Sequence, residues 1–333
     1  MKIGVIGTGS WGTALAQVLC DNNQNVLIWG RSKDEVNKIN IDHQLSILGD
    51  VDLNPNLKAT NNFSDIVDSD VVLIATPSQA IDEVCNQINE HFNKKIIIIN
   101  VAKGFHVETS ERLSTTIRRL IKPEILINVV SLIGPTHAEE VVIRLETAIT
   151  AVCEDLSIAE EIQHLFSNDY FRVYTSADEI GAEIGAAVKN VIALASGILA
   201  GLGLGDNARA ALITRGLAEI RRLGVAMGGN DQTFFGLTGV GDLIVTATSH
   251  HSRNFQAGII IGKNDSAQYF WETNKKTVEG VRAVKVVKKL AEKYNVSMPI
   301  SNEVYNVLYD NELPSEAINK LMNRRLKSED VNE

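Results

Sequence analysis

The chain has 333 residues, 44% of them hydrophobic and 22% charged, which is typical of a globular protein with more than one core. Its net charge of −9 excludes a general attraction to nucleic acid or to an anionic membrane surface. The three cysteines, Cys20, Cys85 and Cys153, have no metal-ligand spacing. They fit buried thiols in a reducing cytoplasm, so neither a disulfide nor a metal site is expected.

The first predicted strand, residues 2–6, leads directly into a glycine-rich turn, Gly7-Thr8-Gly9-Ser10-Trp11-Gly12, and then into a helical pattern. A G-x-G-x-x-G motif between a strand and a helix is typical of a dinucleotide site. Its first glycine makes the tight turn, its second lets the backbone approach a pyrophosphate, and its third allows close helix–strand packing. The helix N-terminus then directs N–H groups at the phosphates. The turn therefore predicts binding of NAD(H) or NADP(H).

The second predicted strand, residues 25–29, bears on the choice between these two cofactors. NAD sites usually place Asp or Glu at the end of this strand to bind the ribose 2′-hydroxyl. Here the strand is followed by Gly30-Arg31-Ser32-Lys33, and no acid occurs before Asp34. Arg31 can stack on adenine or bind a 2′-phosphate, so NADP(H) is expected to be accepted. The alternative is that Arg31 is a solvated surface charge.

Further apolar strands are predicted over residues 71–75, 95–101, 125–133 and 147–152, with helices between the earlier ones. This order predicts an α/β Rossmann-like domain whose mostly parallel sheet is covered on both faces. Ligands of such sheets bind beyond the carboxyl ends of the strands. Residues 75–78, 102–104 and 134–140 follow strands, and Lys103 is the best candidate for function among them. His137 is more consistent with packing or capping.

After residue 176 the strand patterns give way to helical ones, which predicts a Rossmann domain over residues 1–178 and an all-α domain over 179–333. Within residues 184–205 the only charged side chain is Lys189. It lies on a stripe of small residues spaced four apart: Gly181, Gly185, Ala193, Gly197 and Gly201. Helix packing explains the glycines but not the lysine. The lysine either snorkels to water or serves as a general acid/base that reaches toward the nucleotide domain. The apolar run is too short to span a bilayer, so a buried core helix is expected.

Two polar groups follow in the helical domain. Asp242 ends a glycine-rich loop, residues 236–242, and is placed to cap a helix or to pair with a lysine. In Ser252-Arg253-Asn254 a guanidinium stands between a hydroxyl and an amide, a set that suits phosphate. The charged residues between 215 and 222 are expected to form ion pairs along their own helix. Residues 263–276 are expected to be an irregular surface segment.

Taken together, these motifs resemble those of the bacterial type of NAD(P)-dependent glycerol-3-phosphate dehydrogenase. The matching segments occur in the family's order and cover nearly the whole chain: GTGSWGTA at 7–14, ATPS at 75–78, Lys103-Gly104, GPTHAEE at 134–140, VKNV at 188–191, NARAALITRGLAE at 207–219, GVGDL at 239–243, SRN at 252–254 and Glu279-Gly280. Residues 142–146 and 263–276 depart from the family's pattern, although neither segment contains a proposed catalytic residue.

The resemblance implies roles for individual residues. Lys189 would exchange the proton, oriented by Asp242 and Asn190, while Lys103 would polarise the same oxygen. The phosphorylated substrate would be bound by Lys103, Gly134, Thr136, Lys189, Asp242, Ser252, Arg253 and Asn254. The dinucleotide would be contacted, besides the three glycines Gly7, Gly9 and Gly12, by Ser10, Trp11, Arg31, Lys103, Ala138, Arg253 and Glu279. The resemblance also implies a cytoplasmic homodimer, favoured too by the glycine stripe, that supplies glycerol phosphate for phospholipid synthesis.

Two other functions compete with this interpretation. A β-hydroxyacid dehydrogenase also joins a Rossmann domain to a helical domain with a catalytic lysine, but it has no need of the phosphate-binding set at 252–254. A non-catalytic nucleotide sensor would need the glycines but not Lys103, Lys189 and Asp242 together. The three polar residues therefore favour an enzyme that acts on a small phosphorylated substrate.

Overall fold

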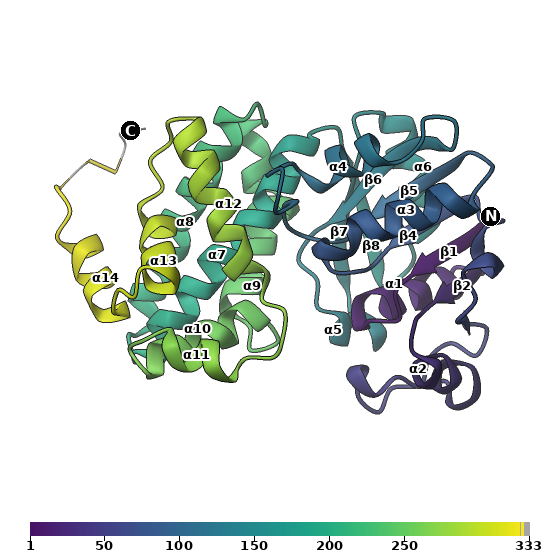
Figure 1. Ribbon diagram of the computed structural model, residues 1–333, viewed down its shortest axis with the longest axis horizontal. Coiled ribbons are helices and arrows are strands. Elements are labelled where there is room, and N and C mark those ends of the chain that lie inside the picture. Colours follow the sequence, from purple (N-terminus) through teal and green to yellow (C-terminus); the bar gives the residue numbers. More distant parts are fainter. Residues whose placement is uncertain (327, 330–333) are drawn as a thin grey trace. The chain divides into compact units, whose positions relative to one another are not determined.

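The computed structural model describes residues 1–326 and 328–329. The chain divides into two compact units, Met1–Glu179 and Ile180–Glu333 (Figure 1). The first unit contains all the described strands and the second is helical. The predicted order, an α/β region followed by an α-helical one, is therefore confirmed.

The first unit is built on one eight-stranded sheet with the strand order β3-β2-β1-β4-β5-β6-β7-β8. All neighbouring strands are parallel except β6 and β7, which pair antiparallel. The sheet is thus mostly parallel, as predicted. The strands are β1 (Lys2–Ile6), β2 (Asn25–Trp29), β3 (Lys58–Thr60), β4 (Val71–Ile74), β5 (Ile96–Asn100), β6 (Leu126–Ile133), β7 (Thr147–Val152) and β8 (Phe171–Ser176).

Helices cover both faces of this sheet. Successive residues of a buried strand point to opposite faces, so each strand places apolar side chains on both. In β5, Ile97 and Ile99 belong to one hydrophobic cluster, while Ile96 and Ile98 belong to another. The first cluster includes residues of α1 and α6, and the second includes residues of α3 and α4. The helices of this unit are α1 (Ser10–Asp21), α2 (Lys33–Asn37), α3 (Ile81–His91), α4 (Leu113–Leu120), α5 (Ala138–Val142) and α6 (Leu156–Phe166).

Two strands, β3 and β8, were not predicted from the sequence. β3 has only three residues and begins with the exposed Lys58. In β8, buried Phe171 and Val173 alternate with exposed Arg172 and Tyr174. Both strands lie at the edges of the sheet, where one face can remain in water. A search for continuous apolar runs finds central strands and misses such edge strands.

The second unit consists of helices packed around α7 (Glu179–Gly201). By length and composition α7 is the one helix of the described residues that could cross a membrane, but 89% of its most apolar window is buried within the protein. It is a core helix, as predicted. The other helices are α8 (Asp206–Ala226), α9 (Asp242–Thr248), α10 (Arg253–Lys263), α11 (Gln268–Thr273), α12 (Glu279–Lys293), α13 (Pro299–Tyr309) and α14 (Pro314–Met322).

The glycine stripe of α7 is a helix–helix contact within the second unit. A Cβ atom on Gly197 would lie 2.1 Å from the carbonyl oxygen of Phe255 in α10, and one on Gly201 would lie 2.4 Å from that of Ile259. A Cβ on Gly258 of α10 would in turn lie 2.1 Å from the oxygen of Leu194. The two backbones touch along this line. The stripe is therefore buried, and the expectation that it favours a dimer contact was wrong.

Residues 263–276 are more ordered than expected. They contain the helix α11, in which Phe270 is 1% exposed and the indole of Trp271 donates a hydrogen bond to the oxygen of Leu308 at 3.1 Å. Two buried or packed aromatic rings within a polar sequence are enough to hold the segment on the helical core. The segment lies largely at the surface, as predicted, but it contains the helix α11 and is therefore not irregular throughout.

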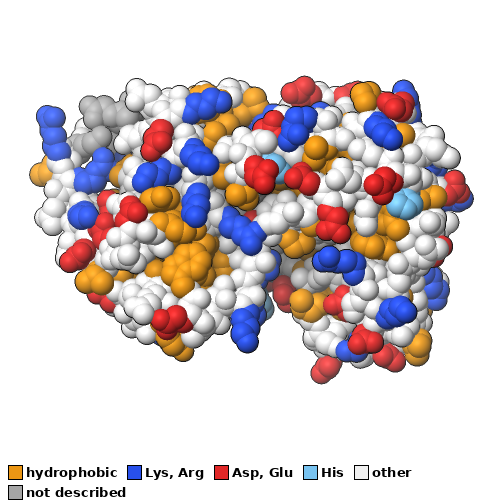
Figure 2. Space-filling view, viewed as in Figure 1, with side chains coloured by type: hydrophobic (Ala, Val, Ile, Leu, Met, Phe, Trp, Pro, Cys, Tyr) orange, Lys and Arg blue, Asp and Glu red, His pale blue; other side chains and the backbone are white. Residues whose placement is uncertain are grey.

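The face of the second unit seen in Figure 2 carries many Lys and Arg side chains around α12. This helix has a surplus of basic residues, and two of its lysines lie over tyrosine rings of α13: Lys288 is 3.7 Å from the ring centre of Tyr305, and Lys285 is 4.1 Å from that of Tyr309. The lysine stems thus pack on aromatic faces. The negative net charge of the chain does not describe this surface.

The prediction of ion pairs along the 215–222 helix was also wrong. Glu219 of α8 is 1% exposed and accepts hydrogen bonds from the backbone N–H groups of Ile300 and Ser301, at 2.5 and 3.1 Å. Arg222 donates to the oxygen of Ser297, and Arg221 pairs with Asp231. Glu219 therefore satisfies the first N–H groups of α13 and joins two helices.

We expect this buried carboxyl to make stability depend on pH. Burial raises the pKa of Glu219 from its ordinary value of 4.5 to about 7, against the lowering effect of its hydrogen bonds and of Arg222. The folded protein thus keeps a proton that the unfolded chain has released, so this stabilisation is present below pH 4.5 and is lost as the pH rises through 7. Relative to Glu219→Gln, the free energy of unfolding of the wild type should fall by about 2–3 kcal/mol between pH 5 and 8. Urea unfolding across this range tests it, and parallel pH curves for the two proteins would contradict it.

Candidate functional site

The glycine-rich turn between β1 and α1 has three glycines with three different surroundings. Gly7 has a φ of +119°, and a Cβ there would lie 2.8 Å from the oxygen of Ala75. A Cβ on Gly12 would lie 2.3 Å from the oxygen of Gly7. A Cβ on Gly9 would meet no atom within 4 Å. Packing therefore requires glycine at Gly7 and Gly12, whereas Gly9 leaves open space at the N-terminus of α1.

This turn fits a dinucleotide. Gly9 is the N-cap of α1 and supplies no side-chain cap, so the first N–H groups of the helix remain available to phosphate oxygens. Two buried polar atoms have no hydrogen-bond partner within the described residues. They are Nε1 of Trp11, in the glycine-rich motif, and Oγ1 of Thr76, in the segment 75–78. Ser10 is the first residue of α1, and Ala138 is buried at the start of α5. Unfilled donors around an open turn are what a bound ligand would satisfy.

Gly9→Ala should separate folding from dinucleotide binding. Its φ of −68° suits any residue and its added Cβ would meet no protein atom, so the variant should fold, with a loss of stability below about 1 kcal/mol from the poorer N-cap. The methyl group would stand where a pyrophosphate must approach the backbone, and the Kd for NADH should rise at least about tenfold. Calorimetric titration measures the Kd, with thermal unfolding as the control. Unchanged affinity would show that the dinucleotide does not approach Gly9.

Lys103, Gly134 and Thr136 come together at the ends of two neighbouring strands. Lys103 follows β5 and donates a hydrogen bond from Nζ to the carbonyl oxygen of Gly134 at 2.9 Å, just beyond β6. The Thr136 hydroxyl donates to the same oxygen at 3.2 Å. The ammonium is half-buried at the carboxyl edge of the sheet, where ligands of this fold bind. His137 precedes α5 but makes no side-chain cap, so the helix start is not capped as expected.

In the second unit, Lys189 of α7 is buried and forms an ion pair with Asp242, the first residue of α9. Its Nζ also donates to the hydroxyl of Thr246 at 2.7 Å. Lys189 is 3% exposed and Asp242 is fully buried. The snorkelling alternative is therefore wrong, and the ammonium contacts Asp242 and Thr246 of α9 in its own unit. A buried ammonium is tolerated only with such partners.

Thr246 was missed in the sequence analysis. It lies four residues after Asp242 on α9, so both side chains occur on one face of the helix. Its hydroxyl donates to the backbone oxygen of Asp242 at 2.7 Å, which leaves its lone pairs facing Lys189. The spacing of four from a predicted site residue was the signal that could have identified it.

Asn190, Asn254 and Gly280 link three helices beside this ion pair. The amide of Asn254 in α10 donates to Oδ1 of Asn190 in α7 at 2.9 Å, and its Oδ1 accepts from the N–H of Gly280 in α12 at 2.8 Å. A Cβ on Gly280 would lie 2.4 Å from the oxygen of Asn190, so the helices are in contact there. Asn254 is therefore committed to protein contacts at both ends of its amide, and Glu279 is held at the start of α12 next to it.

Ser252 and Arg253 form the N-terminus of α10. The hydroxyl of Ser252 is the N-cap and accepts from the N–H of Phe255 at 3.2 Å. Arg253 is the first helical residue and is exposed. The positive end of the helix dipole and the guanidinium of Arg253 thus lie at the same place. This arrangement favours the binding of an anion.

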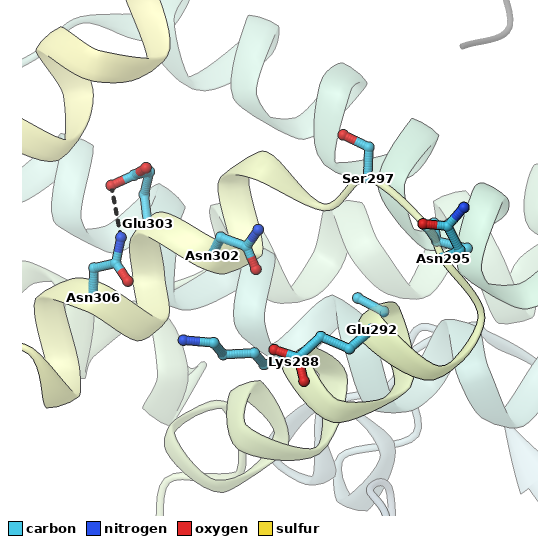
Figure 3. Close-up of a pocket in the computed structure, with 9 residues that line it drawn as sticks. Lys288, Glu292, Asn295, Ser297, Asn302, Glu303 and Asn306 are labelled. Atoms are coloured by element: carbon cyan, nitrogen blue, oxygen red, sulfur yellow. Dashed lines mark hydrogen bonds between the residues drawn. The ribbon is translucent and has the colours of Figure 1, made fainter.

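A groove between α12 and α13 has a volume of about 560 Å³ and is shown in Figure 3. Its polar lining includes Lys288, Glu292, Asn302 and Glu303. In the view, Glu303 and Asn306 are joined by a hydrogen bond of 3.3 Å. None of the predicted site residues lines this groove. It is an open surface feature of the helical unit and is separate from the Lys189 cluster.

Comparison with known proteins identifies the family. Residues 2–159 match the family model of the NAD-dependent glycerol-3-phosphate dehydrogenase N-terminus, and residues 178–319 match that of its C-terminus. The chain is 47% identical over 330 residues to glycerol-3-phosphate dehydrogenase (NAD(P)+) of Lysinibacillus sphaericus, covering 98% of each chain. It is 48% identical over 330 residues to the protein of the same name from Listeria monocytogenes, again covering 98% of each.

A solved structure agrees with this assignment. The crystal structure of glycerol-3-phosphate dehydrogenase from Coxiella burnetii superimposes with a TM-score of 0.88 at 32% identity, covering 97% of this chain and 99% of that one. Sequence and fold therefore match the same proteins over both units. This chain belongs to the NAD(P)-dependent glycerol-3-phosphate dehydrogenase family of oxidoreductases.

Proposed function

We propose that this protein catalyses reversible hydride transfer between NAD(P)H and dihydroxyacetone phosphate, forming sn-glycerol 3-phosphate. Family membership supports the reaction. The observation that carries the mechanism is the buried Lys189, which pairs with Asp242 and donates to Thr246. A buried ammonium held by a carboxylate and a hydroxyl is suited to deliver a proton to a reacting oxygen.

The proton and the phosphate have separate binding groups. The nicotinamide, when bound, would supply a hydride to the carbonyl carbon. Lys189, as ammonium, would protonate the oxygen of that carbonyl. In the oxidative direction the amine of Lys189 takes the hydroxyl proton. Arg253, with Ser252 and the N-terminus of α10, binds the phosphate, and this remote binding positions the reacting carbon. Asn190 and Asn254 hold α7 and α10 in register.

The first unit is proposed to bind the dinucleotide at Gly7, Gly9, Ser10, Trp11 and Gly12, and Lys103 to stabilise negative charge on the substrate oxygen. Lys103 is held by Gly134, beside Thr136. On the family resemblance, Arg31, Ala138, Arg253 and Glu279 are proposed as further cofactor contacts.

The first experiment is to follow loss of NADH and of NADPH absorbance with dihydroxyacetone phosphate. Rapid oxidation is expected, and the ratio of the two rates gives the cofactor preference. No oxidation by folded protein that binds cofactor would reject this substrate and favour a hydroxyacid. Retention of cofactor with no turnover on any of these substrates would favour a nucleotide sensor.

The setting of the reaction is also proposed. The buried free thiols Cys20, Cys85 and Cys153 fit a reducing cytoplasm, where the product would feed phospholipid synthesis. A homodimer rests on the family resemblance, because the glycine stripe is buried within one chain. Sedimentation equilibrium would test it, and a single species of 36.4 kDa would contradict it.

A further inference from the structure

The carboxylate of Glu35 lies near the end of β2, although no acidic residue directly follows this strand in the sequence. Gly30 directly follows β2 and has no side chain to offer a ribose. A Cβ on Gly30 would lie 2.4 Å from Cγ2 and 2.5 Å from Oγ1 of Thr8. The side chain of Thr8, from the glycine-rich turn, therefore fills the place of a residue-30 side chain. Its hydroxyl donates to Oε2 of Glu35 at 2.5 Å.

The backbone around Glu35 holds this carboxylate in place. Ser32 is the N-cap of α2 and its hydroxyl accepts from the N–H of Glu35 at 3.3 Å. Ser-x-x-Glu at a helix start is the sequence of a capping box, in which the glutamate turns back to the N-cap N–H. Here the carboxylate bonds to Thr8 of the glycine-rich turn instead. Among the described residues, Oε1 of Glu35 has no hydrogen-bond donor, and the side chain is half-buried.

We propose that Glu35 sets the cofactor preference of this enzyme by presenting its carboxylate to the adenosine ribose, so that NADH is bound in preference to NADPH. In this fold the ribose hydroxyls lie at the end of the second strand, and an acid there accepts a hydrogen bond from the 2′-hydroxyl. The same negative charge repels a 2′-phosphate. Glu35 performs from α2 the role that a residue at position 30 cannot perform. The inference rests on the proposed dinucleotide site.

Arg31 favours NADPH instead, because its guanidinium can bind a 2′-phosphate. Its side chain, however, is held by fewer contacts than that of Glu35. It is exposed and forms no ion pair within the part of the chain that the structure describes. An exposed arginine must lose side-chain entropy to bind a phosphate, whereas Glu35 is already fixed by Thr8 and Ser32. The pre-organised carboxylate therefore outweighs the exposed cation.

The test is direct binding of each dinucleotide to Glu35→Gln, measured by calorimetric titration without substrate. Glutamine keeps an oxygen that accepts from Thr8, so α2 should remain attached while the charge is lost. The wild type should bind NADH more tightly, and the ratio of the two Kd values should shift toward NADPH by about tenfold, the equivalent of one charge-assisted hydrogen bond. Asp34→Asn is the matched control, because Asp34 is exposed on the preceding position. It should change the ratio less than about twofold.

A second variant tests the positioning by Thr8. Thr8→Val keeps the shape against Gly30 but removes the donor to Glu35, so it should also reduce the preference for NADH. An unchanged ratio in Glu35→Gln, or an equal shift in Asp34→Asn, would overturn this inference while leaving the dinucleotide site intact. Preference of the wild type for NADPH would also overturn it. Failure of folded wild type to bind either dinucleotide would overturn the proposed function as well.

Discussion

Lys189→Met is expected to reduce turnover of dihydroxyacetone phosphate by about 10²- to 10⁴-fold, the usual range for loss of a general acid. The ammonium is the proton donor in the proposed mechanism, and methionine of similar length has no proton to give. The Kd for NADH, whose proposed site is the glycine-rich turn of the first unit, should stay within about twofold. Steady-state kinetics and calorimetric titration of NADH measure the two effects separately.

The ion pair complicates this variant, because Asp242 would be left buried without its cation. Removal of one partner of a buried pair costs about 3–5 kcal/mol of stability. Lys189→Arg keeps the charge beside Asp242 and should fold normally, yet it should remain almost inactive because a guanidinium does not release its proton. Turnover near that of the wild type in either variant would reject Lys189 as the acid/base.

Arg253→Ala is expected to lower kcat/KM for dihydroxyacetone phosphate by about 10²-fold, since one guanidinium–phosphate interaction is worth about 2–3 kcal/mol. Both terms should change: KM rises because the phosphate is bound less tightly, and kcat falls because the remote group no longer positions the reacting carbon. Oxidation of NADH with unphosphorylated dihydroxyacetone, slow in both proteins, should be little altered.

Lys289→Ala is the charge-matched control for Arg253→Ala, because it removes one exposed cation from α12 of the same unit. It should leave both constants within about twofold of the wild type. If Arg253→Ala lowered activity equally with dihydroxyacetone and with its phosphate, the arginine would not be the phosphate ligand. A change confined to the KM of NADH would instead assign it to the cofactor.

Much of the fold could be predicted because its signals are local. The turn from Gly7 to Gly12 combines a strand, a glycine pattern and a helix within a few residues, and central strands buried on both faces read as unbroken apolar runs. The edge strand β8 was not predicted, because its exposed Arg172 and Tyr174 interrupt such a run. The helix α11 was not predicted, because Phe270 and Trp271 are the residues that anchor an otherwise polar segment.

The sequence by itself determined the class of the protein: a dinucleotide-binding sheet followed by helices, with one lysine in an apolar helix. It also singled out Asp242 as a partner for a lysine. These conclusions depend on residue type and on spacing within single elements, which the covalent chain carries directly.

Only the tertiary structure decided which side chains meet. Thr246 joins Lys189 and Asp242 because α9 packs against α7, and Glu219 caps α13 from 81 residues away. Glu35 reaches the glycine-rich turn because Gly30 leaves room for Thr8. Such contacts depend on the packing of distant elements, and the order of residues does not specify that packing locally.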